Sequence, residues 1–267
     1  MVPSACQRAQ HTPVRRGCKH VSRTFESFPM SATPPDLVSC ILPTRDRPDF
    51  FPQALGCFLC QTYRPAELIV VDDGERSVEG LCAGLDRVRY IRLSRPEHTG
   101  MKLNIGIEEA RGSLLQKLDD DDYYHPEFLK TAAAALASQS GQHVITWDCF
   151  LVLFAGEEAA RYTGHGWTAG GTLCFSRDLW ECAPFREVTL GEDWWFLQDH
   201  RERVTTVCAP ERYILVRHGR NTWTTHEDDS VDSRFRLMPV YPKPLGRFID
   251  RRHLKFYRSL KYAPAIG

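Results

Sequence analysis

Residues 38–74, VSCILPTRDRPDFFPQALGCFLCQTYRPAELIVVDDG, contain two short apolar runs that each end in polar residues. Residues 37–44 and 66–74 have the length and continuous hydrophobicity of strands that are covered on both faces. Between them, residues 47–63 carry apolar side chains at helical spacing. A strand, a helix and a second strand in this order indicate a parallel βαβ unit.

The same alternation continues beyond this unit. Residues 88–93 predict a third strand, and residues 101–112 predict a helix that ends at Gly112. Residues 113–122 predict a fourth strand, and residues 126–139 form a helix by propensity. The pattern therefore predicts an α/β fold whose mostly parallel central sheet has helices on both faces.

The second half of the chain is less regular. Residues 143–154 predict one strand, and residues 213–224 predict a strand that ends in a polar turn. Residues 164–176 are rich in glycine and aromatic residues, which suits a loop that approaches a ligand closely. Leu245 to Leu260 could form a basic amphipathic helix.

The overall charge and the cysteines narrow the class of protein. The 34 Lys and Arg residues balance the 34 Asp and Glu residues, so no net field attracts nucleic acid, and we predict no nucleic-acid partner. There are ten cysteines but no apolar signal-peptide core and no apolar run long enough to span a membrane. We therefore expect a cytoplasmic protein without a disulfide framework, in which Cys57 and Cys60 belong to the core.

Four consecutive acids, Asp119 to Asp122, end the fourth predicted strand. Two like charges about 6 Å apart repel by roughly 2–3 kcal/mol at an effective dielectric constant near 20. Such a run can be a solvated face. However, the apolar residues before it and Pro126 after it indicate an ordered strand-to-helix junction. A divalent cation there would turn repulsion into attraction, and oxygen ligands suit Mg²⁺ or Mn²⁺.

Polar residues end three of the predicted strands: residues 43–47, 72–74 and 119–122. Because ligands bind beyond the carboxyl ends of parallel strands, we expect these groups to meet at one edge of the sheet. The sequence contains no GxGxxG, GxxxxGK[ST], HExxH or GxSxG motif. The absence of these motifs argues against a dinucleotide dehydrogenase, a P-loop NTPase, a zincin and an α/β-hydrolase.

Taken in order, these motifs resemble those of the family 2 glycosyltransferases. Residues 38–74 resemble the opening of that family: a strand, a PTYNR-like turn, a helix ending Q.Y and a strand ending DDGS. NIGIEEARGSLLQKLDDDDYYHPEFL, residues 104–129, resembles its next block. GTLCFSRDLW with LGEDWWF, and VRHGRNTWT, resemble its two later blocks. The resemblance implies a GT-A fold, in which a Rossmann-like sheet is fused to a smaller acceptor-binding part.

The same resemblance implies transfer of a sugar from a nucleoside diphosphate sugar to an acceptor nucleophile, with inversion. A UDP-sugar is favoured, and the acceptor would be a glycan, a lipid, a peptide or a small molecule. The alternatives are a GT-A protein that binds a nucleotide sugar or glycan without turnover, and a sugar-nucleotide pyrophosphorylase. Residues 43–51 lack the glycines that such a pyrophosphorylase needs in its first loop.

Site roles follow from the matched positions. Asp121 is implied as the direct ligand of Mg²⁺ or Mn²⁺, with Asp119 and His218 as further metal ligands, although His218 could also be a packing residue. Such a cation stabilises the charge that develops on the departing diphosphate. The residues implied in donor binding are Pro43, Thr44, Arg47, Asp72, Asp73, Lys102, Asn104, Asp119 and Asp120.

Inversion also needs a base opposite the leaving group. The resemblance implies that Asp193 is this base and that Glu192 orients it or binds the acceptor. Trp194 and Trp195 either stack on a sugar ring or belong to the core. A neighbouring indole would raise the pKa of the carboxylate by excluding water.

The matched blocks and the composition suggest four segments. Residues 1–36 would be a basic, flexible tail, and residues 37–150 the nucleotide-sugar-binding half. Residues 151–238 would form the acceptor-binding and catalytic half, followed by a basic, helical segment at 239–267. That last segment either contacts an anionic acceptor or the membrane surface, which would make the protein peripheral at the membrane, or packs over the edge of the domain.

Overall fold

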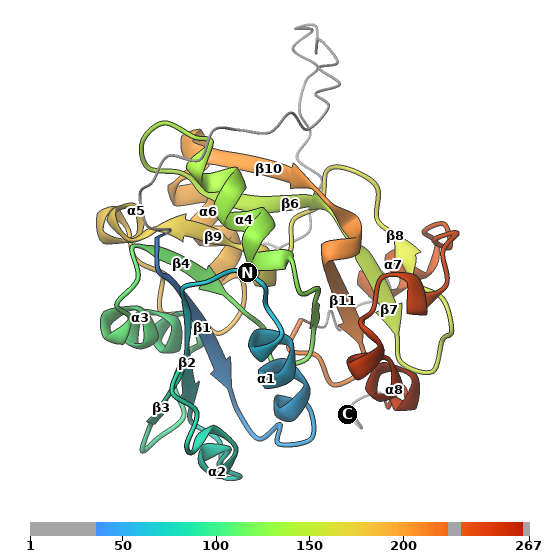
Figure 1. Cartoon of the computed structure of the whole chain (residues 1–267). Coiled ribbons are helices and arrows are strands. Elements are labelled where there is room, and N and C mark those ends of the chain that lie inside the picture. Colours follow the sequence, from blue (N-terminus) through green and yellow to red (C-terminus); the bar gives the residue numbers. More distant parts are fainter. Residues whose placement is uncertain (1–35, 224–230, 264–267) are drawn as a thin grey trace, which may run out of the picture.

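The computed structural model describes residues 36–223 and 231–263 (Figure 1). The predicted flexible tail therefore lies, except for Asp36, outside the described residues, and so does the end of the predicted basic segment.

A seven-stranded sheet forms the centre of the molecule, in the strand order β10-β6-β9-β4-β1-β2-β3. Strands β3, β2, β1 and β4 are parallel, as predicted, and β10 is parallel to β6. Strand β9 is antiparallel to both β4 and β6, and so joins the two parallel groups. The strands are β1 Val38–Thr44, β2 Ala66–Asp72, β3 Val88–Arg92, β4 Leu114–Lys117, β6 Val144–Cys149, β9 Cys174–Ser176 and β10 Val204–Cys208.

Both faces of this sheet are covered, because alternate side chains of the strands enter two different cores. Leu42 and Val70 pack in one core with Phe51 of α1 and Phe128 of α4. Neighbouring strand residues such as Ile41 pack in the other core, with side chains of α3, α5 and α6. The continuous apolar runs of the sequence are thus explained by burial on two faces.

The helices predicted in the first half are present with other limits: the helix predicted over residues 47–63 is α1 Phe51–Leu59, and the one predicted over residues 126–139 is α4 Phe128–Ala137. The helix predicted to end at Gly112 ends at Glu109, because Ala110 is already extended, with a ψ angle of 147°. The helices are α1 Phe51–Leu59, α2 Glu79–Cys82, α3 Thr99–Glu109, α4 Phe128–Ala137, α5 Arg177–Cys182, α6 Glu192–Asp199, α7 Val231–Arg236 and α8 Arg251–Ser259. Short 3₁₀ turns lie at Gly170–Thr172, Arg201–Arg203, Pro210–Arg212 and Leu245–Arg247.

A second, four-stranded sheet has the order β5-β11-β7-β8. Its strands are β5 Tyr123–Tyr124, β7 Leu151–Phe154, β8 Arg161–Tyr162 and β11 Tyr213–Arg217. The single strand predicted over residues 143–154 is therefore wrong. Its first part, β6, belongs to the central sheet and its second part, β7, to the small sheet, and both read as one apolar run because both are buried.

The C-terminal helix is shorter than predicted. Residues Leu245–Arg247 form a 3₁₀ turn, and α8 begins only at Arg251, where the side chain of Asp250 accepts a hydrogen bond from the Arg252 amide. Its buried residues His253 and Tyr257 pack toward α1, and its arginines and Lys255 are exposed. This packing supports the predicted alternative of a helix over the domain edge.

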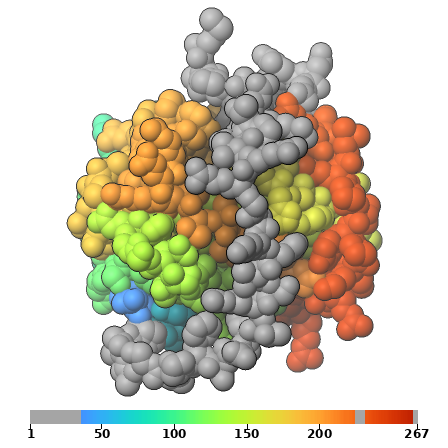
Figure 2. Space-filling model, turned by 90° about the horizontal axis from the view of Figure 1, so that it is seen from above, coloured from blue at the N-terminus to red at the C-terminus, as the bar shows by residue number. Residues whose placement is uncertain are grey.

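The surface view shows where the later segments of the chain lie. Seen from above, the yellow-to-orange segment that includes α5 and β10 and the orange-red C-terminal segment lie on opposite sides of the molecule (Figure 2).

In residues 36–223 and 231–263, no helix has both the length and the apolar character that crossing a bilayer requires.

Candidate active site

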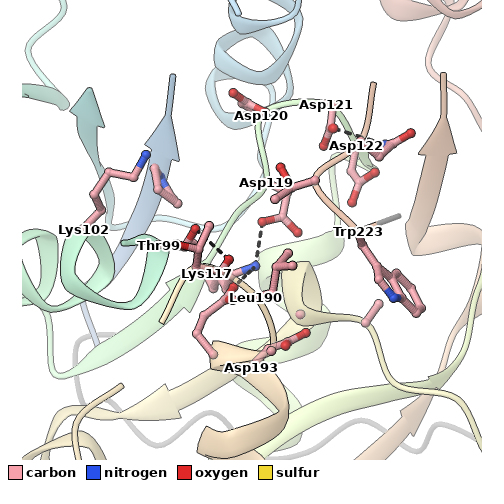
Figure 3. Close-up of a pocket in the computed structure, with 18 of the residues that line it drawn as sticks. Thr99, Lys102, Lys117, Asp119, Asp120, Asp121, Asp122, Leu190, Asp193 and Trp223 are labelled. Carbon is pink, nitrogen blue, oxygen red and sulfur yellow. Dashed lines mark hydrogen bonds and ion pairs between the residues drawn. The ribbon is translucent and has the colours of Figure 1, made fainter. Parts of the chain in front are cut away.

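A pocket of about 590 Å³ opens at the carboxyl ends of β1 and β4 (Figure 3). The turn after β1, the acids after β4, the start of α6 and the segment after β11 all contribute to its walls. The sequence-predicted residues that line it are Pro43, Thr44, Arg47, Lys102, Asp119, Asp120, Asp121, Glu192, Asp193, Trp194 and Trp195. The structure thus brings together residues from four separate motifs, as the convergence of strand ends predicts.

The strand that leads to the four acids is shorter than predicted. Strand β4 ends at Lys117, and the acids lie in the bend that follows it. There each carboxylate finds its own partners instead of facing one solvated side, and Asp120, Asp121 and Asp122 are buried. The acids are therefore not a solvated face.

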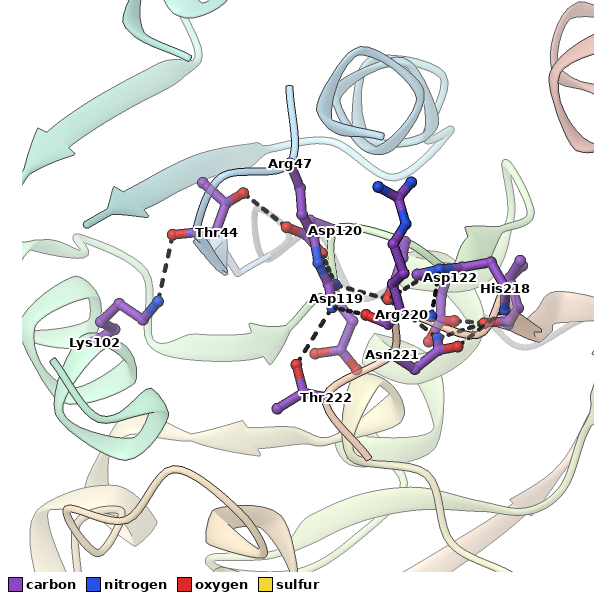
Figure 4. Close-up of polar contacts among 12 residues, drawn as sticks. Thr44, Arg47, Lys102, Asp119, Asp120, Asp122, His218, Arg220, Asn221 and Thr222 are labelled. Atoms are coloured by element: carbon purple, nitrogen blue, oxygen red, sulfur yellow. Dashed lines mark hydrogen bonds and ion pairs between the residues drawn. The ribbon is translucent and has the colours of Figure 1, made fainter. Parts of the chain in front are cut away.

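Arg47 holds two of the acids (Figure 4). Its Nη1 donates to Asp120 Oδ1 and to Asp121 Oδ2, each at 2.7 Å, and its Nη2 donates to the Arg220 carbonyl oxygen at 3.0 Å. The Thr44 hydroxyl also donates to Asp120 Oδ2 at 2.7 Å. Burial raises the pKa of Asp120, and Arg47 opposes this rise.

Asp121 has two further partners from the segment after β11. His218 Nε2 lies 3.1 Å from Asp121 Oδ2, and Asn221 Nδ2 donates to the same oxygen at 3.3 Å. Burial alone would raise the pKa of Asp121, but the positive charge of Arg47 and the His218 contact outweigh it and hold the pKa at about 2. Asp121 is therefore ionised throughout the neutral range.

Asp122 serves the framework of the site. It accepts hydrogen bonds from the Tyr213 hydroxyl and, at 2.8 Å, from the Val216 amide. The Tyr257 hydroxyl of α8 donates to the Asp122 carbonyl oxygen at 2.9 Å. Burial, reinforced by Asp121 and Asp119, raises the pKa of the Asp122 carboxyl well above its usual value.

Lys117 is a site residue that the sequence did not reveal. Its Nζ lies 2.6 Å from Asp119 Oδ1 and 3.6 Å from Glu192 Oε1, and Figure 3 shows it between Asp119 and Asp193. Burial lowers its pKa, but the surrounding carboxylates, Asp119 first, raise it to a net value above the usual one, so Lys117 carries a charge. A lysine as the last residue of a buried strand is a signal that could have identified it.

Glu192 and Asp193 are adjacent but differ in environment. Glu192 is buried, and this burial together with the nearby Asp193 raises its pKa to about 8, against the opposing effect of Lys117. Asp193 is half-buried on the pocket wall, where its Oδ1 accepts a hydrogen bond from the Trp194 amide at 2.8 Å.

Two glycines let the acids of both walls approach each other. A Cβ atom on Gly170 would lie 2.4 Å from Asp193 Oδ2, and one on Gly171 would lie 2.8 Å from Asp119 Oδ2. The glycine-rich loop predicted to approach a ligand thus passes close to the acids of both pocket walls. A Cβ atom on Gly170 would also lie 3.0 Å from Lys117 Nζ, so Asp119, Lys117 and Asp193 all pack against this loop.

The two tryptophans at the start of α6 are half-buried on the pocket wall. Their ring centroids are 4.5 Å apart in an edge-to-face arrangement. The guanidinium carbon of Arg186 lies 3.9 Å from the Trp195 ring centroid, so Arg186 covers part of this ring. Sugar stacking by Trp194 and Trp195 stays a prediction.

Three predicted donor residues do not line the pocket. Asp72 is fully buried and accepts hydrogen bonds from the Tyr90 hydroxyl and the Gly74 amide. Asp73 accepts a 2.8 Å contact from Lys102 Nζ, which itself reaches the pocket. Asn104 binds the Phe185 backbone and the Trp180 indole. These three side chains thus bind neighbouring protein groups outside the pocket lining. Their contact with a donor stays a prediction.

His218 also lies outside the residues that line the pocket. The Arg220 amide donates to its Nδ1 at 3.3 Å, so Nε2 carries the proton that is donated to Asp121. Phe50 packs on the imidazole, with ring centroids 4.4 Å apart. In this arrangement His218 orients Asp121, and its predicted role as a metal ligand is untested.

The acids fit a hard divalent cation. Oxygens of Asp120 and Asp121 converge on one nitrogen of Arg47, which shows that a single positive centre can satisfy both carboxylates. Asp119 presents a further, half-buried carboxylate on the same pocket wall. An all-oxygen donor set of this kind suits Mg²⁺ or Mn²⁺.

Residues 39–148 match the family model described as glycosyl transferase family 2. An uncharacterized glycosyltransferase of Rickettsia conorii is 28% identical over 131 residues, which is 47% of this chain and 21% of that protein. The chain thus matches about a fifth of the length of that relative. The predicted family is confirmed over the matched region.

Two solved structures share the fold. Residues 1–349 of S. aureus TarS in complex with UDP superpose with a TM-score of 0.54 at 19% identity, covering 67% of this chain and 60% of that one. The mannosyltransferase PcManGT of Pyrobaculum calidifontis, in complex with GDP-Man and Mn²⁺, has a TM-score of 0.52 at 15% identity, covering 71% and 59%. The predicted GT-A fold is confirmed.

Arg47→Ala should lower the stability of the folded protein, because the buried carboxylates of Asp120 and Asp121 lose the guanidinium group that they share. We expect a loss of about 2–4 kcal/mol, below the usual range for a buried pair because Arg47 is partly exposed. This corresponds to a Tm lower by roughly 5–15 °C in a thermal melt. Mn²⁺ should restore part of the loss. Arg45→Ala, an exposed change in the same turn, is the control, and equal melting of the two variants would contradict the charge-pairing role.

Glu192→Gln should stabilise the protein in a pH-dependent way. Because burial raises the folded-state pKa of Glu192 to about 8 from an ordinary 4.5, the folded protein holds a proton that the unfolded chain releases. Wild-type stability therefore falls as pH rises from about 5 to 8, and the Tm advantage of the variant should grow over this window and then level off. Exposed Glu187→Gln is the control, and a pH-independent difference would show that Glu192 is ionised when folded.

Proposed function

We propose that this chain, whose residues 39–148 belong to glycosyl transferase family 2, is a metal-dependent inverting glycosyltransferase. It would move a sugar from a nucleoside diphosphate sugar to an acceptor nucleophile. The observation that carries this proposal is one pocket in which Asp119 to Asp122 face Asp193 and Glu192 across Lys117. One wall suits a cation and a diphosphate, and the other offers a base.

The donor would occupy the side of the pocket formed by the turn after β1. The complexes of TarS with UDP and with UDP-GlcNAc, and of PcManGT with GDP-Man and Mn²⁺, support a nucleoside diphosphate sugar. We favour a UDP-sugar. Pro43, Thr44 and Arg47 would border the nucleoside, and Lys102, which already neutralises Asp73, would support this turn through the Thr44 carbonyl oxygen.

Asp121 and Asp119 would hold Mg²⁺ or Mn²⁺, with His218 fixing the carboxylate of Asp121 through Nε2. The bound cation supplies charge stabilisation to the leaving diphosphate. Arg47 already pairs with Asp121. If it leaves Asp121 and pairs with diphosphate oxygens instead, it would also stabilise the charge of the leaving group.

Asp193 would take the proton of the acceptor nucleophile as it attacks the anomeric carbon. It is the more accessible of the two acids at the start of α6, and Trp194 and Trp195 beside it offer aromatic surface to an acceptor or donor sugar. Glu192, whose pKa of about 8 keeps it largely protonated at neutral pH, can donate a hydrogen bond, which suits the predicted role of orienting Asp193 or binding the acceptor.

The proposed donor-binding and acceptor-binding halves share one central sheet. Residues 37–150 would bind the donor and residues 151–238 the acceptor, yet β9 and β10 of the second half complete the central sheet of the first. Relative motion of the two halves is therefore limited. The exposed basic residues of α8 would allow a cytoplasmic protein to contact an anionic acceptor or a membrane surface.

Nucleotide binding tests the donor site directly. In thermal melts with UDP, GDP, CDP or dTDP, one nucleotide should stabilise the protein with Mn²⁺ present, by about 2.7 kcal/mol at 100-fold saturation. Asp121→Asn should remove the Mn²⁺-dependent part of this shift, whereas the exposed change Asp178→Asn should not. If no nucleotide raises the Tm in the presence of Mg²⁺ or Mn²⁺, the donor does not bind at the proposed site.

Asp193→Asn separates an enzyme from a non-catalytic binding protein. The variant should keep the nucleotide-dependent thermal shift and lose transfer by at least about 100-fold, the usual contribution of a general base. Transfer is measured as nucleoside diphosphate release from the identified donor with a panel of acceptors. Glu181→Gln, at an exposed acid outside the pocket, is the control. Turnover equal to wild type would assign the base to another residue.

A further inference from the structure

A second group of potential metal ligands lies apart from the pocket, at the ends of β6 and β10. It consists of Asp148, Cys149, His165 and Cys208, each of which contributes one ligand atom, and these atoms all lie within 4.8 Å of one another. The two sulfur atoms are 3.1 Å apart, and His165 Nδ1 lies 2.7 Å from Asp148 Oδ2. None of these four residues lines the pocket described above.

A break in the strand register brings two of these side chains together. Trp147 pairs with Val207 and Cys149 pairs with Cys208, so Asp148 has no partner on β10. In a regular strand, successive side chains point to opposite faces. A bulge of this kind re-aims a side chain, so that Asp148 and Cys149 can contribute to the same cluster.

The loop after β8 delivers His165. The Thr163 amide donates to the Phe150 carbonyl oxygen and the Trp167 amide donates to the Asp148 carbonyl oxygen, both at 3.1 Å, which fastens the loop to β6. The residues on either side of His165, Gly164 and Gly166, have φ angles of 70° and 91°. Few other residues adopt this left-handed backbone, which turns the loop back so that the imidazole reaches Asp148.

The chemistry of the four ligands differs from that of the active site. Two sulfurs, one imidazole nitrogen and one carboxylate oxygen form a donor set that zinc takes in tetrahedral sites. Ligands 2.0–2.3 Å from a tetrahedral zinc ion are about 3.3–3.8 Å from one another, so the cluster needs only small side-chain adjustments. We propose that Asp148, Cys149, His165 and Cys208 form a structural site for zinc or a similar soft divalent cation.

One oxygen atom of the cluster lacks a hydrogen-bond partner, and a bound cation would compensate for this. Asp148 Oδ1 is buried and has no hydrogen-bond partner, an arrangement that is unfavourable for a carboxylate oxygen. Coordination of the metal would release the protons of both thiols. The Tyr162 hydroxyl, which interacts with the Cys149 sulfur, would remain as a hydrogen-bond donor to the resulting thiolate.

The position of the site indicates what such a metal would do. It would tie together β6, the edge strand β10 and the loop that carries His165. That loop continues directly into Thr168, Ala169 and Gly170, which line the pocket. The bound ion would thus hold the glycine segment that packs against Asp119 and Asp193, and would act on the pocket only through this backbone.

The test uses the full chain, prepared with a reductant and stripped of metal. It should bind one equivalent of Co²⁺ with the tetrahedral spectrum and the sulfur-to-cobalt charge-transfer absorption of thiolate ligands, and Zn²⁺ should displace this cobalt. The acids of the active site offer oxygen ligands alone, so cobalt bound there gives no sulfur band. His165→Ala, which changes a largely exposed side chain, should weaken binding at least 10-fold.

Two cysteine variants complete the test. Cys208→Ser should abolish the sulfur band and make the Tm insensitive to Zn²⁺, whereas Cys182→Ser, at another exposed cysteine, should leave both unchanged. The site is overturned if cobalt produces no sulfur band, or if the two variants bind it equally. A Cys149–Cys208 disulfide that persists in the reduced preparation would also overturn it. Nucleotide binding is measured separately, so neither result decides the glycosyltransferase proposal.

Discussion

The fold around the pocket depends on how four consecutive carboxylates are compensated. Arg47 comes from the turn after β1, Lys117 from β4 itself, and His218 and Asn221 from the segment after β11. These contacts link residues up to 100 positions apart in the chain. An unpaired buried charge costs several kcal/mol, so the strand ends cannot separate without exposing or protonating an acid. The same concentration of negative charge that would suit the proposed cation also fixes the geometry of the pocket walls.

Lys117 joins this network to the acids of α6. It contacts Asp119 on one side and Glu192 on the other, so the charge state of the proposed donor site and that of the proposed acceptor site are coupled through one ammonium group. A cation or a diphosphate bound near Asp119 would change the field at Glu192 over this short path. Gly170 and Gly171 leave room for this path, because a Cβ atom on Gly170 would meet Asp193 and Lys117, and one on Gly171 would meet Asp119.

Much of the first half could be predicted because its physical signals are local. Continuous apolar runs identify β1 and β2, and the polar residues after β1, together with the acids after β4, identify the sheet edge where the pocket lies. Pairing over long distances carries no such signal. The division of residues 143–154 at Phe150 depends on which sheet each part joins, and the insertion of β9 between two parallel groups depends on tertiary contacts. The cluster around Cys149 was missed for the same reason, since Cys208 lies 59 positions from Cys149, and so was the contact of Lys117 with Glu192.

The two neighbouring acids of α6 illustrate how position alone can divide chemical roles. Glu192 and Asp193 share one helical turn, so their sequence context is nearly the same. Glu192 is only 7% exposed, and its burial favours the protonated form, which suits a group that donates a hydrogen bond. Asp193 projects from the same turn toward the cavity, where a nucleophile can reach its carboxylate. Both acids line the pocket, so the proposed assignment of Asp193 as the base rests on its greater exposure together with the family pattern.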